Sequence, residues 1–340
     1  MPFLRIFRKY RFLGACFILL LPGCISQKDQ KTSIPAIPMI DAHSQASKYL
    51  DLDNIIPLMD KAGVKRTLLS ARRGLKWRKL AALARAHPDR ITASVRSKGE
   101  HYRNNKPKYY RRLAKQIADP IFGAMAEIMI YHAEKRKGLA AEVDVDFSEP
   151  QPLAAIQAAR KKGWPIILHI EFASLPGEES AQKEFMNNFE NFLKSQENHP
   201  VALTHLGQLD ADQAAYLLAR HQNLYLITSH ANTWFTRQSS QPWTEMVDGD
   251  ELVPRWRKLV LAYPERFILA FDNVWQEHWG WFYINQARAW QKVFRSLPPE
   301  VAHAVAHKNA EKLWNLPPLG VRSPKQVDKP ILMSDFEFQK

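Results

Sequence analysis

The sequence predicts a protein of the α/β class, folded as a single (β/α)8 TIM barrel over residues 38–317. Eight short apolar segments recur along the chain, and stretches with helical periodicity lie between them. Near-continuous apolar strands are typical of parallel pairing with both faces buried, and eight is the number that closes such a barrel. A doubly wound open sheet is the competing arrangement, but its usual glycine-rich phosphate loop, GxGxxG or Walker, does not occur in the sequence.

The predicted strands are short and apolar, and a glycine or a His-Pro or Tyr-Pro pair precedes several of them and ends the helix before. They span residues 38–43, 66–71, 91–95, 123–128, 165–170, 201–205, 224–228 and 267–272. The clearest helical segments between them are residues 52–62, 77–86, 152–162 and 210–220. Asp210 is the expected N-cap of the last helix, because its carboxylate can accept a backbone N–H there.

Two segments exceed ordinary loop length. Residues 97–112 are basic and aromatic, whereas residues 231–256 carry three tryptophans. Loops that follow barrel strands lie on the active face, so both segments are expected to form its rim or a lid. A solvated helix face is the alternative for residues 97–112. Residues 318–340 lack a clear period and are expected to form an extended C-terminal arm.

The N-terminus predicts export. Basic residues between positions 5 and 11 precede the apolar run FLGACFILLL, which is too short to cross a bilayer. The run ends at Leu21-Pro22-Gly23-Cys24, which resembles a bacterial lipobox. This resemblance implies a lipoprotein signal peptide over residues 1–23 and a lipid anchor at Cys24. An uncleaved anchor or an ordinary secretory signal is the alternative.

The resemblance also implies a place in the cell envelope. Residues 24–37 would form a polar tether from the membrane to the barrel, which would face the periplasm. Ile25 follows the cysteine where inner-membrane lipoproteins carry Asp, so the outer membrane is expected if the source is Gram-negative.

Charge and cysteine content limit the classes of binding partner and the side chains that could bind a metal. The formal net charge of +14 suits a nucleic acid, a membrane surface or an anionic substrate. Export and the lack of a recognition motif disfavour nucleic acid. Because the two cysteines, Cys16 and Cys24, both lie in the leader region, a metal site in the barrel must use imidazole, carboxylate or amide ligands. Nothing in the sequence indicates the oligomeric state.

Ionisable residues at the ends of apolar strands predict the functional site. An unpaired charge is costly to bury, and strand ends of a barrel converge on one pocket. Imidazoles and carboxylates that converge without thiols suit Zn²⁺, Mn²⁺ or Fe²⁺. The residues at these ends are Asp41, His43, Glu127, His169, His205 and Asp272.

The ordered series of motifs resembles the amidohydrolase superfamily, in its aminocarboxymuconate-semialdehyde decarboxylase-like branch. Residues 40–45, IDAHSQ, stand where that family has IDxHxH, and His169 stands where it has a fifth-strand histidine. His205-Leu206-Gly207 matches its HxG segment, and Asp272 stands at its eighth-strand aspartate. Residues 307–314 resemble its closing GNAxRLF segment.

The resemblance implies a metal-activated water and a role for each matched residue. His43, His169 and Asp272 would hold the metal, while His205 and Asp272 would act on protons during catalysis. Glu127 is either a further ligand or a residue that orients a ligand histidine. Zn²⁺ is the expected metal, with Mn²⁺ as the alternative.

Gln45 departs from the family pattern, because it stands at the second histidine of HxH. A neutral amide binds a divalent metal far less well than imidazole does. The three remaining ligands still leave an open position for water, which is the usual design of a catalytic site. Loss of the metal is the other interpretation of Gln45.

Residues after the second and third strands predict an anionic substrate. Arg72 and Arg96, each followed closely by another cation, suit bidentate capture of a carboxylate or phosphate. Trp234 and Trp275 follow strands seven and eight and are expected to cover an organic ligand.

These residues predict a metal-dependent hydrolase of a small anionic organic substrate. A metal-dependent decarboxylase is one alternative. The other is a barrel that lost metal catalysis through Gln45 and acts as a ligand-binding lipoprotein.

Overall fold

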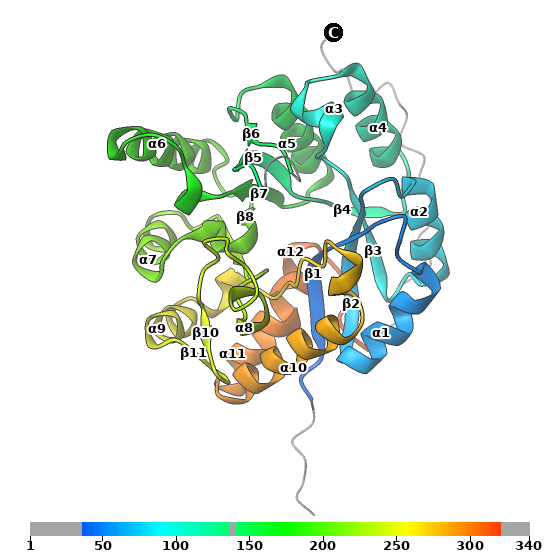
Figure 1. Cartoon of the computed structure of the whole chain (residues 1–340), viewed down its shortest axis with the longest axis vertical. Coiled ribbons are helices and arrows are strands. Elements are labelled where there is room, and N and C mark those ends of the chain that lie inside the picture. The colour runs from blue at the N-terminus through cyan, green and yellow to red at the C-terminus, as the bar shows by residue number, and fades with distance from the viewer. Residues whose placement is uncertain (1–35, 136–139, 321–340) are drawn as a thin grey trace, which may run out of the picture. The chain divides into compact units, whose positions relative to one another are not determined.

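The computed structural model describes residues 36–135 and 140–320, in which parallel strands alternate with helices around a barrel (Figure 1). The predicted signal peptide with its lipid site Cys24, the tether as far as residue 35, and the arm beyond residue 320 lie outside the described residues. Within the described ranges, no helix is both long and apolar enough to cross a membrane.

The strands hydrogen-bond in two runs, β1-β2-β3-β4 and β12-β9-β8-β7-β5-β6, with a separate β10-β11 hairpin. Pairing is parallel except for β5 with β6 and for the hairpin. The strands are β1 (Met39–Ala46), β2 (Val64–Ala71), β3 (Ile91–Val95), β4 (Phe122–Met125), β5 (Ile128–His132), β6 (Val143–Asp144), β7 (Ile166–Ile170), β8 (Val201–Leu203), β9 (Leu224–Ile227), β10 (Val247–Asp248), β11 (Glu251–Leu252) and β12 (Phe267–Ile268).

Helices follow the barrel strands and cover their outer side (Figure 1). They are α1 (Ile55–Ala62), α2 (Trp77–Ala86), α3 (Glu100–Arg103), α4 (Pro107–Ile117), α5 (Pro150–Lys162), α6 (Glu179–Ser195), α7 (Ala211–Arg220), α8 (Thr233–Thr236), α9 (Pro254–Ala262), α10 (Trp281–Arg295), α11 (Pro299–His303) and α12 (Asn309–Leu313). Asp210 caps α7 as predicted: its carboxylate accepts from Gln213 N at 2.8 Å, and the Gln213 side chain accepts from Asp210 N.

The fourth barrel strand consists of two pieces. β4 pairs with β3 and β5 pairs with β7, so the two hydrogen-bonded runs meet where the chain passes Ala126 and Glu127. The single strand predicted over residues 123–128 is therefore wrong in its detail. Glu127 therefore lies between the two strands and takes no part in their pairing, so its side chain does not have to follow the alternation of a regular strand.

The barrel closes between β1 and the chain that follows β12. Ala42 N donates to Leu269 O at 3.0 Å, Asp272 N donates to His43 O at 2.7 Å, and Gln45 N donates to Asn273 O at 2.9 Å. With the β4/β5 segment counted as one strand, eight strands complete the circle. The predicted (β/α)8 barrel is confirmed.

Two buried side chains reinforce this closing seam. The Asp41 carboxylate accepts from Phe271 N at 3.0 Å, and the Ser44 hydroxyl donates to it at 2.6 Å. Ser44 Oγ also accepts from Asn273 N at 3.1 Å. Asp41 and Ser44 therefore satisfy backbone donors in the chain after β12 that would otherwise be buried without an acceptor.

Apolar side chains fill the lower barrel. One residue from most strands projects inward, and α12 packs beneath them with Trp314 just after its end. The interior cluster is Ile40, Ala42, Leu68, Ala124, Ile167, Ala202, Ile227, Ile268, Ala270, Ala310 and Trp314. Asn309 anchors α12, because its amide donates to Pro264 O and Phe267 O, each at 2.8 Å.

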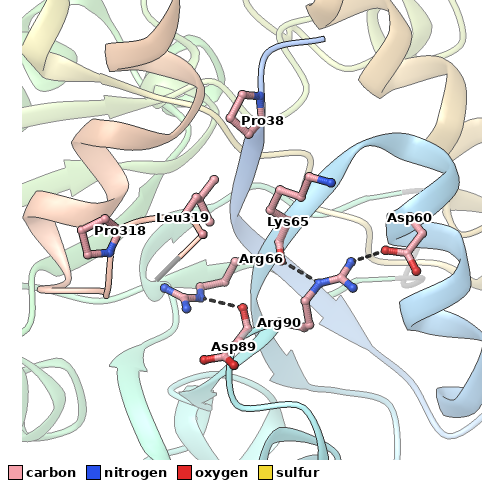
Figure 2. A pocket seen from close by; sticks show the side chains of 9 residues that line it. Pro38, Asp60, Lys65, Arg66, Asp89, Arg90, Pro318 and Leu319 are labelled. Atoms are coloured by element: carbon pink, nitrogen blue, oxygen red, sulfur yellow. Dashed lines mark hydrogen bonds and ion pairs between the residues drawn. The ribbon is translucent and has the colours of Figure 1, made fainter. Parts of the chain in front are cut away.

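A cavity of about 480 Å³ opens at the N-terminal ends of β1 and β2 (Figure 2). Its arginines are partnered. Arg90 Nη2 lies 2.7 Å from Asp60 Oδ1, and Arg66 Nε donates to Asp89 O at 3.2 Å. The basic side chains of this cavity therefore stabilise the bottom face of the barrel and leave little uncompensated charge.

The basic segment 97–112 is largely helical, not an open loop. It forms α3 and most of α4, and α4 buries Tyr109, Leu113 and Ile117 against the barrel. Most of the basic residues of α4 lie on its solvent side, as the helix-face alternative predicts, but Lys98 forms an ion pair with the buried Glu127. The helix-face alternative therefore describes α4, and the start of the segment reaches the active face as the rim prediction has it.

Replacement of Asp41 by Ala tests the closing seam. We expect the free energy of unfolding to fall by about 3 kcal/mol, because two backbone N–H groups and the Ser44 hydroxyl lose a buried acceptor. Denaturant titration measures the change, with Asp144→Ala on an exposed edge as the control. Equal stabilities of the two variants would contradict the role of the seam.

Candidate functional site

A bulge in β1 aims two side chains into the upper barrel. The register with β2 shifts between Asp41 and Ser44, where β1 holds one residue more than its partner. Below the shift, Ile40 and Ala42 face the apolar interior; above it, His43 and Gln45 lie beside the strand-end carboxylates. A bulge of this kind re-aims side chains next to active sites.

Two carboxylates meet His43 and Gln45 at the centre of the site. His43 Nε2 lies 3.3 Å from Asp272 Oδ1 and 3.5 Å from Glu127 Oε1, yet it makes no hydrogen bond. The Gln45 amide nitrogen donates to Asp272 Oδ1 at 2.7 Å and to Glu127 Oε1 at 3.2 Å. Lys98 Nζ forms an ion pair with Glu127 Oε1. All of these groups except the Lys98 stem are buried.

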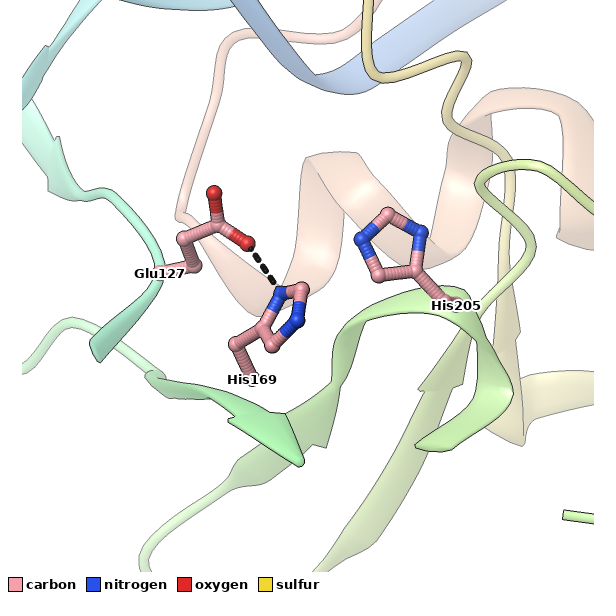
Figure 3. A group of neighbouring side chains, drawn as sticks. All are labelled: Glu127, His169 and His205. Atoms are coloured by element: carbon pink, nitrogen blue, oxygen red, sulfur yellow. Dashed lines mark hydrogen bonds and ion pairs between the residues drawn. The ribbon is translucent and has the colours of Figure 1, made fainter. Parts of the chain in front are cut away.

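His169 lies between two carboxylates. Its Nδ1 is 2.8 Å from Glu127 Oε2, as Figure 3 shows, and its Nε2 is 3.2 Å from Glu171 Oε1. Glu171 also accepts from Lys135 Nζ at 2.7 Å and from Ala133 N at 3.0 Å. Burial opposes ionisation of Glu171, but its bonds to His169 and Lys135 outweigh burial and lower its pKa far below the usual value.

Two stacked imidazoles form the opposite wall. The rings of His205 and His230 lie 4.5 Å apart at 20°, and each Nε2 is 3.6 Å from Asp272 Oδ2. Ser229 Oγ accepts from His205 N at 3.0 Å and lies 3.1 Å from His205 Nδ1, which fixes that ring. Burial, with repulsion from neighbouring histidines, lowers the pKa of both rings to about 3. Both are therefore neutral at physiological pH.

Left-handed backbone marks this wall. His205, His230 and Asp272 have φ of 54°, 63° and 48°. Such conformations cost free energy in residues other than glycine and gather at functional sites. Gly207, two residues after His205, also has positive φ, and a Cβ there would lie 3.1 Å from Leu203 and Phe172. The left-handed conformation and the tight space both favour glycine at this position of the HxG segment.

Asp272 is an ionised acceptor at the centre of the site. Burial opposes its ionisation, but His43, whose Nε2 lies 3.3 Å from Asp272 Oδ1, lowers its pKa well below the usual value. Burial also lowers the pKa of Lys98 to about 7, against the attraction of Asp272. The site therefore combines an ionised Asp272, the neutral imidazoles of His205 and His230, and one titratable ammonium.

The donor set fits a divalent metal ion. His43 Nε2 is a buried imidazole nitrogen without a hydrogen bond that faces two carboxylates, an arrangement that a cation would complete. Ligand atoms of His43, Glu127 and Asp272 lie within 4.8 Å of one another, as do those of Glu127, His169 and His205. Gln45 and Lys98 compete with a metal, because they already donate to the same carboxylates.

The residues predicted to bind substrate lie in three different places. Arg72 donates to Val274 O at 2.8 Å, stacks on Trp275 at 4.9 Å and lies within electrostatic reach of Asp272, so these two residues are at the site. Arg96 instead lines a separate cavity beside α2 and α4. Trp234 packs against Trp281 at 4.9 Å, in an aromatic cluster at the start of α10.

Three residues of the site were not predicted from the sequence. Glu171 lies two residues beyond His169, on the same face of an extended strand end, and the period of two could have identified it. His230 lies in the turn after β9, which ends at Ile227, two residues beyond the predicted strand 224–228. Trp243, with ring centroids 4.9 Å from His205 and 4.7 Å from His230, lies in the tryptophan-rich segment 231–256 that is predicted to form a rim or lid, but nothing in the sequence distinguishes it from the other two tryptophans there.

Comparison with known proteins supports the fold and the family. A family model described as "Amidohydrolase" matches residues 40–316. An uncharacterised TIM-barrel protein from Bordetella bronchiseptica shares 17% identity and a TM-score of 0.50, over 78% of this chain and 83% of that chain. No curated protein matches the sequence significantly.

Two further solved structures match over most of this chain and almost all of their own chains. The 2,6-dihydroxybenzoate decarboxylase from Rhizobium has 13% identity and a TM-score of 0.48, covering 82% of this chain and 99% of that chain. A zinc-bound amidohydrolase from Burkholderia multivorans has 14% identity and a TM-score of 0.47, covering 82% and 100%.

Replacement of Lys98 by Met tests its competition with a metal. We expect the affinity for Zn²⁺ or Mn²⁺ to rise about tenfold, because a cation next to Glu127 is removed. Equilibrium dialysis measures the affinity, and Lys292→Met, which removes an exposed ion pair with Asp250, is the control. An affinity equal to that of the unmodified chain would show that the ammonium does not compete.

Proposed function

This chain belongs to the amidohydrolase family whose model matches residues 40–316, and from that membership we propose a metal-dependent hydrolase of a small anionic organic substrate. The buried His43 Nε2 that faces Asp272 and Glu127 without a hydrogen bond is the observation that carries the proposal. One imidazole nitrogen with two carboxylate oxygens within 3.5 Å is a donor set that suits a divalent metal ion.

His43, Glu127 and Asp272, whose ligand atoms lie within 4.8 Å of one another, would hold the metal, and His169, grouped with Glu127 and His205, would be a further ligand. When bound, a metal such as Zn²⁺ or Mn²⁺ supplies a Lewis acid that polarises substrate and lowers the pKa of water. Gln45 would contribute its amide oxygen if the amide were turned, since oxygen and nitrogen of an amide are interchangeable in space.

Neutral imidazole and ionised carboxylate provide the proton chemistry. His205 is neutral at physiological pH and can accept a proton from water, while Asp272, 3.6 Å from its Nε2, stabilises the cation that forms. His230 stacks on His205, and its Nε2 lies 3.2 Å from the backbone carbonyl oxygen of Asp272. Trp243 covers both rings and excludes water from them.

The cations at the mouth of the site favour an anionic substrate. Arg72 and Lys98 lie within electrostatic reach of Asp272, and Arg73 adds its guanidinium over Trp275 at 3.6 Å. They would attract and orient a carboxylate or phosphate of the substrate. A carboxylated substrate also makes decarboxylation the alternative reaction of the same residues, which release of CO₂ would identify.

A second candidate function is ligand binding without metal catalysis. Gln45 and Lys98 favour it, because together they donate to both carboxylates and so supply the positive charge that a metal would bring. Metal content separates the two functions.

Elemental analysis of the mature chain, purified without chelator, tests the enzyme proposal. We expect about one equivalent of transition metal, and about tenfold higher affinity in Gln45→His because imidazole replaces an amide. His43→Ala should lose the metal, whereas His199→Ala on the outer side of the barrel should keep it. Less than about a tenth of an equivalent, unchanged after Zn²⁺ or Mn²⁺ is added, would leave only the binding function.

We also propose that the protein is anchored in the cell envelope by lipid at Cys24, on the strength of the lipobox-like sequence. Cys24→Ser should abolish lipid labelling and release the protein from the membrane fraction, since one lipid-bearing residue carries the anchor. Cys16→Ser, within the apolar run, is the matched control. Membrane retention of Cys24→Ser would contradict the proposal.

A further inference from the structure

A second cavity, of about 310 Å³, lies beside the candidate site and is lined by cations. Its walls come from the chain between β2 and α2, the end of β3, and α4. Four basic side chains line it, and no carboxylate does: Lys76, Arg78, Arg96 and Arg112. None of the four forms an ion pair with a carboxylate in the described part of the chain.

Arg96 is fixed in this cavity. Its Nε donates to Lys98 O at 3.0 Å, and its backbone N donates to Gln116 Oε1 at 3.2 Å. The guanidinium lies over Gly99, where a Cβ would meet its Nη2 at 2.7 Å, so the glycine makes room for it. Burial lowers the pKa of Arg96 to about 10, and repulsion from Arg112 and Arg72 adds to this effect.

The start of α2 adds uncompensated positive charge to the same cavity. Its N-cap residue Lys76 makes no side-chain capping bond, and its first turn has no acidic residue. The backbone N–H groups of a first turn lack partners within the helix, and the helix dipole is positive there. Trp77 and Arg78, the first two residues of the helix, both line the cavity.

The bottom cavity of Figure 2 provides the contrast. There, Arg90 and Arg66 have Asp60 and a backbone carbonyl as partners, so the fold compensates its arginines where they serve stability alone. Repulsion between Arg96 and Arg112 has no such compensation. Like charges held together without a counter-charge are expected where an anion completes the arrangement.

We propose that this second cavity is a phosphate-binding site, which takes inorganic phosphate or the phosphate group of a monoester. Arginine guanidinium groups and the N–H groups of a helix N-terminus are the donors that recognise a tetrahedral dianion. Four positive side chains also match the double negative charge of phosphate better than the single charge of a carboxylate. The site is separate from the metal centre and does not rest on the function proposed for it. It also accounts for part of the basic segment 97–112, which the metal centre leaves unused.

Titration calorimetry of the mature chain with inorganic phosphate, in the presence of EDTA, tests the proposal. Because the chelator removes metal, phosphate binding and metal chemistry can fail independently. We expect a Kd below about 1 mM, which rises at least about tenfold in Arg96→Gln and in Arg112→Gln. Arg90→Gln in the bottom cavity is the matched control and should stay within about twofold.

Phenyl phosphate distinguishes the two sources of the anion. A Kd at least about tenfold below that of phosphate supports a monoester that contacts Trp77, and an equal Kd supports free phosphate. Absence of saturable binding of either compound up to about 10 mM would overturn the proposal. So would equal weakening in Arg90→Gln and the two cavity variants, because binding would then follow net charge alone.

Discussion

The pairing of the first strand with the chain after β12 is the constraint on which the site depends. Asp41 and Ser44 hold the backbone of residues 271 and 273, and Asp272 between them bonds to His43 O. The same short segment therefore closes the barrel and brings the Asp272 carboxylate to within 3.3 Å of His43 Nε2. Barrel closure and site geometry cannot be altered separately at this seam.

Charge balance is the second organising feature. Three buried carboxylates, Glu127, Glu171 and Asp272, stand among histidines that burial keeps mostly neutral. Lys98 and Lys135 each compensate one of the glutamates. The remaining negative charge is centred on Asp272, next to the imidazole without a hydrogen bond, and this is where a cation gains most.

Much of the site could be predicted because ionisable residues in apolar strands are costly unless they have a function. That reasoning identified His43, Glu127, His169, His205 and Asp272, which the structure brings together. It could not identify Trp243, whose position depends on how a long loop folds back, or the cavity that holds Arg96. Strand periodicity gives the direction of a side chain near a strand end, but it does not give the direction of a flexible guanidinium several bonds away.

The closing seam also sets when the site can appear during biosynthesis. Gln45 and Asp272, which share a hydrogen bond, are 227 residues apart in the chain. The first strand is among the first parts of the barrel to be made, yet its second neighbour emerges only near the end of synthesis. Until residues 269–273 have been made, the nascent chain leaves an edge of the first strand unpaired. Under the export proposed for this protein, the same delay would keep the chain unfolded while it crosses the membrane.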